Sequence, residues 1–192
     1  MKNFQISNYN IGMLYYFYTL LLIFINVIVF FLIRNGRLDA DDLDMSYHTV
    51  FNLRQYHRIL TSAFCHVDPI HLLMNMISLY NVGSFAESYF GHLRMLLIYF
   101  VSMILGKCFS LYIRHSNRDD YTSSMGASGA ISGLLGAYFL VILHRYGFSG
   151  MQYLLRPVVS LVMISALPRV DGTSHFCCMA VGMALTWLLY LL

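Results

Sequence analysis

Charged residues are scarce in this 192-residue chain: they make up 11% of it, against 58% hydrophobic residues. Soluble domains contain about 25% charged and about 45–50% apolar residues, so the composition excludes an ordinary soluble domain. It predicts an integral membrane protein in contact with a lipid bilayer. The net charge of +3 comes from scattered Lys and Arg residues rather than from a basic tract, so we expect no nucleic-acid partner.

Metal-binding patterns are also missing. Cys65, Cys108, Cys177 and Cys178 form no CxxC pair and no His/Cys ladder, which are the spacings that zinc sites use. No HExxH sequence occurs and the histidines are spread over different apolar runs, which argues against an intramembrane metalloprotease. We therefore predict no metal and no cofactor, and interpret the cysteines as buried small hydrophobic residues.

Six apolar runs account for most of the chain, and each approaches the roughly 20 residues that a helix needs to span a bilayer. They are Met13–Ile33, Ile70–Phe90, Met95–Ile113, Ser128–Leu143, Met151–Leu167 and Phe176–Leu192. The pattern predicts an all-α membrane protein with six transmembrane helices, in which residues 1–192 form a single domain. The first run exceeds the roughly 7–15 apolar residues of a signal peptide, so we expect it to remain as a helix.

One connection, over residues 34–69, is much longer than the others. Its apolar and polar residues alternate, and a long loop of this kind is expected to lie in the membrane interface rather than extend freely. We predict a short helical hairpin there that braces the bundle.

Polar residues in the second run suggest a site. His71 and Asn75 are four residues apart and therefore share one face of a helix. Two side-chain donors aimed at one point can stabilise the oxyanion that forms when a serine attacks a carbonyl group. The alternative is a polar patch that ties helices together.

Ser128 is the candidate nucleophile. It lies between Gly126 and Gly129, where a polar loop meets the fourth apolar run. At the N-terminus of that helix, unpaired backbone N–H groups and the helix dipole favour an oxyanion. The alternative is a serine that merely caps the helix.

His175 directly precedes the sixth run and is the candidate general base. Cys178 and Gly182 place small residues one turn below it, and such a face can pack closely on the glycine face of the fourth run. Ser128 and His175 would then meet near the same membrane surface, as in serine hydrolases. Asp171 is interpreted as the cap of this helix rather than as a third catalytic residue. The alternative for His175 is a structural hydrogen bond.

Together these residues resemble the rhomboid family of intramembrane serine proteases, from about Arg58 to the end of the chain. The resemblance implies a six-helix rhomboid-type bundle in which Ser128 is the nucleophile and His175 the general base. It also implies an oxyanion hole made by His71, Asn75 and the backbone N–H of Ser128. The matching residues are His66, His71, Asn75, Gly83, Glu87, Gly91, Gly126–Ala130, His175 and Gly182.

The resemblance assigns supporting roles around the site to His66, Glu87, Gly126, Gly129 and Ser132. The chain departs from the family at three places. Ser132 stands where relatives often have an aromatic residue that stacks on the catalytic histidine, so we expect it to point into the same cavity. A cysteine at 178 replaces a glycine, and His57–Arg58 replaces a Trp-Arg pair.

We predict an intramembrane serine endopeptidase that cleaves transmembrane segments of other membrane proteins, in a bacterial cytoplasmic membrane. The Lys and Arg residues of the connections favour the reverse of the orientation that the family implies. One alternative is a proteolytically silent rhomboid-like protein that binds membrane clients. A small-solute transporter is disfavoured, since the chain shows no internal repeat.

Overall fold

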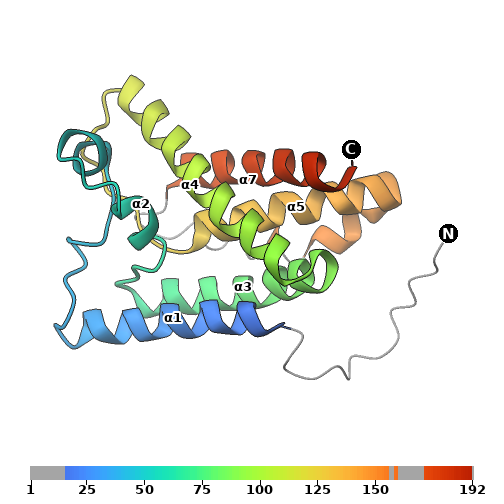
Figure 1. Cartoon of the computed structure of the whole chain (residues 1–192), viewed down its shortest axis with the longest axis horizontal. Coiled ribbons are helices and arrows are strands. Elements are labelled where there is room, and N and C mark those ends of the chain that lie inside the picture. The colour runs from blue at the N-terminus through green and yellow to red at the C-terminus, as the bar shows by residue number, and fades with distance from the viewer. Residues whose placement is uncertain (1–15, 156–157, 160–170, 192) are drawn as a thin grey trace.

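A computed structural model describes residues 16–155, 158–159 and 171–191, and their regular structure is helical (Figure 1). The predicted all-α class is therefore confirmed. The long helices are α1 (Phe17–Arg34), α3 (Pro69–Phe90), α4 (His92–Ser116), α5 (Ser128–Tyr146) and α7 (Gly172–Thr186). The short segments are η2 (His48–Asn52), α2 (Arg58–Thr61), η3 (Gly147–Leu154) and η4 (Trp187–Leu191).

Within these residues, four helices are long and apolar enough to cross a membrane: α1, α4, Ser128–Gly150 and Gly172–Tyr190. The second apolar run forms α3, which has 22 residues but carries several polar side chains and is not one of the four. The fifth run, Met151–Leu167, begins in η3 and otherwise falls largely outside the described residues. The count of six spans therefore stays a prediction.

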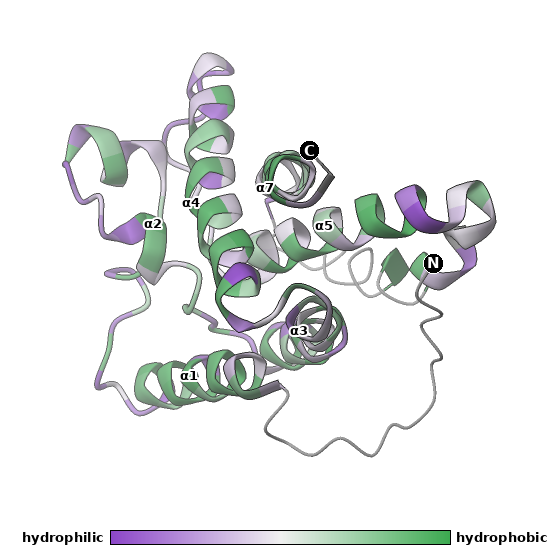
Figure 2. Ribbon diagram, turned by 45° about the vertical axis from the view of Figure 1, so that its right-hand side comes forward, coloured by the Kyte–Doolittle hydropathy of each residue, from purple (hydrophilic) through white to green (hydrophobic). Residues whose placement is uncertain are grey.

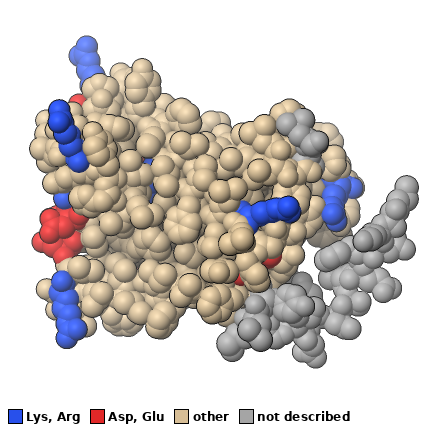
Figure 3. Space-filling model, viewed as in Figure 1, with Lys and Arg blue, Asp and Glu red and all other residues tan. Residues whose placement is uncertain are grey.

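In Figure 1 the helices α1, α3, α5 and α7 all extend along the long axis of the picture and α4 crosses them, whereas in Figure 2 α3 and α7 are seen end-on while α1 and α5 run across the view. The α1–α5 pair and the α3–α7 pair therefore point in different directions. Helix α1 packs on α3, α5 packs on α7, and α4 contacts both α5 and α7. Hydrophobic residues predominate along α1 and along much of α4 and α5 (Figure 2). On the face in Figure 3, Lys, Arg, Asp and Glu lie mostly toward the two ends of the long axis. An apolar band between charged ends is the arrangement of an integral membrane protein.

Capping residues explain where two helices begin. The Asp68 carboxylate accepts a hydrogen bond from the backbone N–H of His71 at 2.8 Å, and Pro69 occupies the first position of α3. Asp171 caps α7 in the same way, by accepting from the Ser174 N–H at 3.1 Å. The predicted cap at Asp171 is confirmed. It starts α7 at Gly172, one turn before the apolar run itself.

Close helix packing brings the two halves of the candidate site together. A Cβ atom added to Gly182 of α7 would collide with the backbone of Gly133 in α5, and one added to Gly136 would collide with the Met179 carbonyl. Only glycine allows this approach. The prediction that α7 packs on the glycine face of α5 is therefore confirmed.

The first loop, between α1 and α3, contains the short segments η2 and α2. Arg58 is buried at the start of α2, where its guanidinium donates to the backbone carbonyl of Asp44 at 3.0 Å and lies 3.3 Å from its carboxylate. It also donates to the carbonyl of Asp41. This arginine therefore folds the loop back on itself. The position of the loop at the membrane interface stays a prediction.

Candidate active site

Ser128 is the first residue of α5, and the loop before it is fixed by the first loop. Met45 and Ser124 exchange two backbone hydrogen bonds, of 3.1 and 2.8 Å, and the N–H of Gly126 donates to the Ser62 carbonyl at 2.7 Å. Gly126 has φ +104°, and a Cβ there would lie 2.9 Å from the His71 ring. Glycine is therefore required for both backbone conformation and space.

Ser128 does not cap its own helix. The capping position belongs to Ala127, and α5 has no side-chain cap at that end. The interpretation of Ser128 as a capping serine is therefore wrong, and its hydroxyl is left for another partner.

That partner is His175. Its Nε2 lies 2.6 Å from the Ser128 Oγ, and both residues are buried. His175 lies in the first turn of α7, where its backbone N–H donates to the Asp171 carbonyl at 3.2 Å. Two residues 47 positions apart are thus placed within hydrogen-bond distance by the close packing of α5 and α7.

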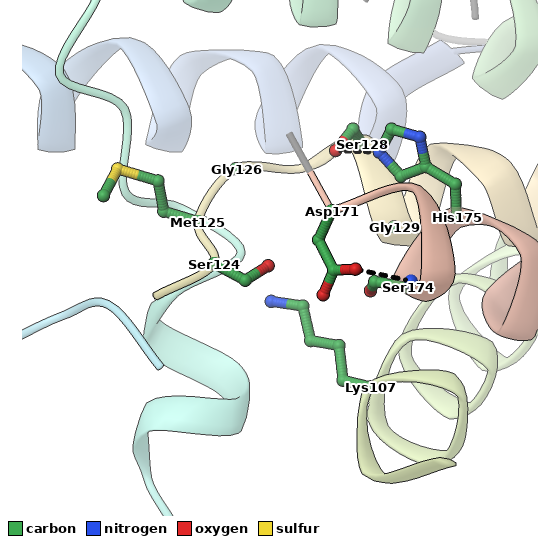
Figure 4. A pocket seen from close by; sticks show the side chains of 9 residues that line it. All are labelled: Lys107, Ser124, Met125, Gly126, Ser128, Gly129, Asp171, Ser174 and His175. Atoms are coloured by element: carbon green, nitrogen blue, oxygen red, sulfur yellow. Dashed lines mark hydrogen bonds between the residues drawn. The ribbon is translucent and has the colours of Figure 1, made fainter. Parts of the chain in front are cut away.

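A small polar recess adjoins this pair (Figure 4). Besides Ser128 and His175, it is lined by Lys107, Ser124, Met125, Gly126, Gly129, Asp171 and Ser174. Gly129 allows α5 to approach α7 closely at the recess, because a Cβ there would lie 3.3 Å from the Cys178 Sγ. The recess is too narrow in this structure to admit a water molecule, so a peptide group could reach the pair only if the recess widened.

His71 and Asn75 lie on the adjacent face of α3 and are both buried. The Nε2 of His71 and the Oδ1 of Asn75 have no hydrogen-bond partner in the described part of the chain. The Asn75 Nδ2 donates to the His71 carbonyl at 2.9 Å. His71 reaches the loop at Gly126, but neither residue lines the recess itself. Their role as oxyanion donors stays a proposal.

His66 contacts the loop that precedes Ser128 and also packs against His71. Its ring centroid lies 5.2 Å from that of His71, and its Nε2 is 3.4 Å from the donating N–H of Ala127. Its Nδ1 is 3.4 Å from the Phe64 carbonyl. Burial lowers the pKa of His66 to about 3, and His71 adds to this shift. His66 is therefore neutral at physiological pH, with Nδ1 carrying the proton.

Ser132 does not point into the recess, so that expectation is wrong. Its side chain is fully buried, and its hydroxyl donates to the Ser128 carbonyl one turn earlier, at 2.8 Å. A serine in a helix often bonds the carbonyl four residues back. An aromatic ring at this position would have to displace packed neighbours.

Glu87 lies away from the recess. Its carboxylate accepts hydrogen bonds from the backbone N–H groups of Tyr18 and Thr19, at 2.9 and 2.8 Å, and from the Thr19 hydroxyl at 2.6 Å. The His92 Nδ1 is 2.6 Å from the same carboxylate. Glu87 thus ties α3 to the start of α1, where a negative charge is favourable.

Sequence reasoning missed three buried polar residues of α4: Lys107, Ser110 and Arg114. The Arg114 guanidinium donates to the Asp171 carboxylate at 3.1 Å, and so does the Ser110 hydroxyl, also at 3.1 Å. Lys107 could have been found, since a charged residue within an apolar run is costly and by default marks a function or a tight pairing. Among the residues that the structure describes, no group of three or more metal-ligating side chains is placed to hold an ion.

The fold and the site define an all-α membrane protein in which a serine and a histidine are in contact at the N-terminal ends of two packed helices. Residues 53–192, which make up more than half of the chain, match the Rhomboid domain family. The chain belongs to the rhomboid family.

Comparison with individual proteins also finds members of the rhomboid family. The chain is similar to RHOMBOID-like protein 4 of Arabidopsis thaliana, with 34% identity over 69% of this chain and 34% of the relative. It is also similar to the Rhomboid protease GluP of Bacillus subtilis, with 30% identity over 82% of this chain and 32% of the relative. The Inactive RHOMBOID-like protein 8 of A. thaliana is 28% identical over 68% and 37%. The chain spans about a third of the length of these relatives, and their sources do not favour a bacterial host over a plant.

Proposed function

We propose that this protein is an intramembrane serine endopeptidase that cleaves transmembrane segments of other membrane proteins. The observation that carries the proposal is the 2.6 Å contact between the Ser128 Oγ and the His175 Nε2. A serine hydroxyl becomes a nucleophile when an adjacent base takes its proton. Helices α5 and α7 hold the two groups at hydrogen-bond distance, so little reorganisation precedes that step.

In the proposed reaction, the Ser128 Oγ attacks the scissile carbonyl carbon while His175 Nε2 accepts the hydroxyl proton. The oxyanion is stabilised by the Ser128 backbone N–H at the start of α5, with His71 and Asn75 as additional donors. His175 then gives its proton to the leaving amine, which leaves an acyl-enzyme. Water hydrolyses this ester with His175 again as the base.

The substrates we propose are single-pass membrane proteins whose transmembrane helix is locally weak. A peptide carbonyl inside a helix is shielded by its own hydrogen bond, so Gly or Pro near the cleavage site would expose it. A bacterial cytoplasmic membrane stays our prediction for the location. The chain covers about a third of the length of these relatives, so its activity and partners are proposals.

A second candidate is a silent rhomboid-like protein that binds membrane clients without cutting them. It is favoured by the similarity to a relative named inactive, and by the departures at Ser132 and Cys178. Against it, this chain keeps both Ser128 and His175 in contact.

Reaction of the purified protein with a fluorophosphonate probe separates the two candidates. We expect labelling of the parent protein, loss of labelling in Ser128→Ala, and labelling of Ser124→Ala, which removes another hydroxyl from the same recess. A folded parent protein that stays unlabelled, yet retains a membrane client, would instead assign it to the silent class.

A further inference from the structure

Helix α4 carries a buried polar face that the proposed chemistry does not use. Lys107, Ser110 and Arg114 are spaced three and four residues apart and so share one side of the helix. All three are buried in a helix apolar enough to span a membrane. Polar groups in such a position are costly unless they make specific contacts. Their contacts lead to the two ends of the Ser128–His175 pair.

One set of contacts, called the first arm below, connects Lys107 through Ser62 with the loop that precedes Ser128. The Lys107 Nζ donates to the Ser62 Oγ at 2.7 Å and to the Ile59 carbonyl at 3.4 Å. The carbonyl of Ser62 in turn accepts the N–H of Gly126 at 2.7 Å. Gly126 lies two residues before Ser128, so Lys107 anchors the turn that holds the loop of the nucleophile.

The second arm runs from Ser110 and Arg114 to His175. One oxygen of Asp171, Oδ2, accepts from the Ser110 hydroxyl and from the Arg114 guanidinium, each at 3.1 Å. The other oxygen, Oδ1, accepts from the Ser174 N–H and caps α7. The Asp171 backbone carbonyl accepts the N–H of His175. Asp171 is thereby fixed on both sides, between α4 and the first turn of α7.

Arg114 also joins the two arms. Its Nε donates to the Asp119 carboxylate at 3.1 Å, and its Nη2 donates to the Thr122 carbonyl. Both partners belong to the segment between α4 and α5 that leads to Ser128. The recess beside the pair is lined by Lys107 and Asp171 together, and Figure 4 shows the Lys107 side chain directed between Ser124 and Asp171.

We propose that the polar face of α4, formed by Lys107, Ser110 and Arg114, positions Ser128 and His175 relative to one another. These are positioning residues: they act through Ser62 on the nucleophile loop and through Asp171 on the helix of the base. The inference rests on the proposed function. It predicts that loosening either arm lowers the turnover number and leaves substrate affinity unchanged, since a misplacement of about 1 Å can cost about 100-fold in rate.

The test uses one variant for each arm in the full chain. In Asp171→Asn the amide oxygen still caps α7, because asparagine is a good capping residue. Its NH₂ group, however, faces the Arg114 guanidinium, which can only donate, and so breaks that contact. In Lys107→Met the side chain keeps its length and loses its donors. Ser116→Ala is the control, since it removes an exposed hydroxyl from the same helix.

The parent protein is first labelled with the fluorophosphonate probe, which tests the proposed function on its own. We then measure kcat, KM and melting temperature for cleavage of a model transmembrane substrate. Each arm variant is expected to lose about 10- to 100-fold in kcat with KM within about twofold of the parent. The control should keep the parental values.

An active parent together with parental kcat in both arm variants would overturn the positioning role while leaving the proposed function intact. A change in KM alone, or a rate loss that matches the loss of folded protein, would also overturn it. If either variant does not fold, Ser110→Ala and Ser62→Ala take its place, since each removes a single hydroxyl from one arm.

Discussion

Replacing Glu87 by glutamine is expected to destabilise the protein while sparing its chemistry. The carboxylate is fully buried and accepts from the Tyr18 N–H and His92 on one oxygen, and from the N–H and hydroxyl of Thr19 on the other. Glutamine keeps one of these oxygens and puts an NH₂ group in place of the other. The hydroxyl of Thr19 or the imidazole of His92 can turn to accept from that group. A backbone N–H can only donate, so it cannot accept from that group.

The expected cost follows from this arrangement. One buried backbone N–H of α1 loses a hydrogen bond to a charged group, worth about 1.5–3 kcal/mol. The start of α1 also loses a negative charge near the positive end of its dipole, worth about 0.3–1 kcal/mol. The sum is about 2–4 kcal/mol. At roughly 2–4 °C per kcal/mol for a chain of this size, the melting temperature should fall by about 4–16 °C.

The assay is thermal unfolding in detergent, together with the initial cleavage rate well below the melting temperature. Ser88→Ala is the matched control, because it removes an exposed hydroxyl from the next position of α3. It should change stability by less than about 0.5 kcal/mol. A Glu87→Gln protein with the parental melting temperature, or with a reduced rate at unchanged stability, would refute the structural role.

Other predictions concern the site itself. Ser128→Ala and His175→Ala should each abolish cleavage by a folded protein, since removing either partner of such a pair costs nearly as much as removing both; substantial cleavage by a folded Ser128→Ala protein would contradict this. His71→Ala and Asn75→Ala should each slow turnover by roughly 10- to 1,000-fold, the scale of a lost oxyanion donor, and parental rates in both would make the pair structural. Because the pKa of His66 falls from 6.5 to about 3 on folding, its contribution to stability is fully present above pH 6.5 and is lost as the pH falls toward 3. The pH dependence of melting should therefore be weaker in His66→Gln, and identical profiles would refute it.

Much of the fold could be predicted because the spans are encoded locally. The runs that became α1 and α4 are apolar enough to be recognised alone. Helix ends were less predictable. The runs at Met95 and Phe176 begin later than α4 and α7 because capping and interfacial residues at helix ends are polar. A hydropathy pattern records the apolar body of a helix and not its caps.

The pairing of Ser128 with His175 was also predictable, because small residues on two helices leave a close approach as their only good packing. The contacts of Lys107 and Asp171 could not be predicted from the sequence. Each depends on a partner more than 40 residues away, in the first loop or in α4. No local period or short motif reports such a pairing. It follows from the tertiary arrangement of α2, α4 and α7.

Ser132 shows how a family pattern can mislead when one residue changes type. An aromatic ring at this fully buried position would have to displace packed neighbours. A serine is small and can satisfy its own hydroxyl, and here it donates to the Ser128 carbonyl inside the helix. The side chain is then buried against neighbours rather than directed into the recess. The backbone N–H of His175 donates to the Asp171 carbonyl, so the position of Asp171 bears on that of His175. Asp171, fixed by Ser110 and Arg114 at the head of α7, supplies such a constraint.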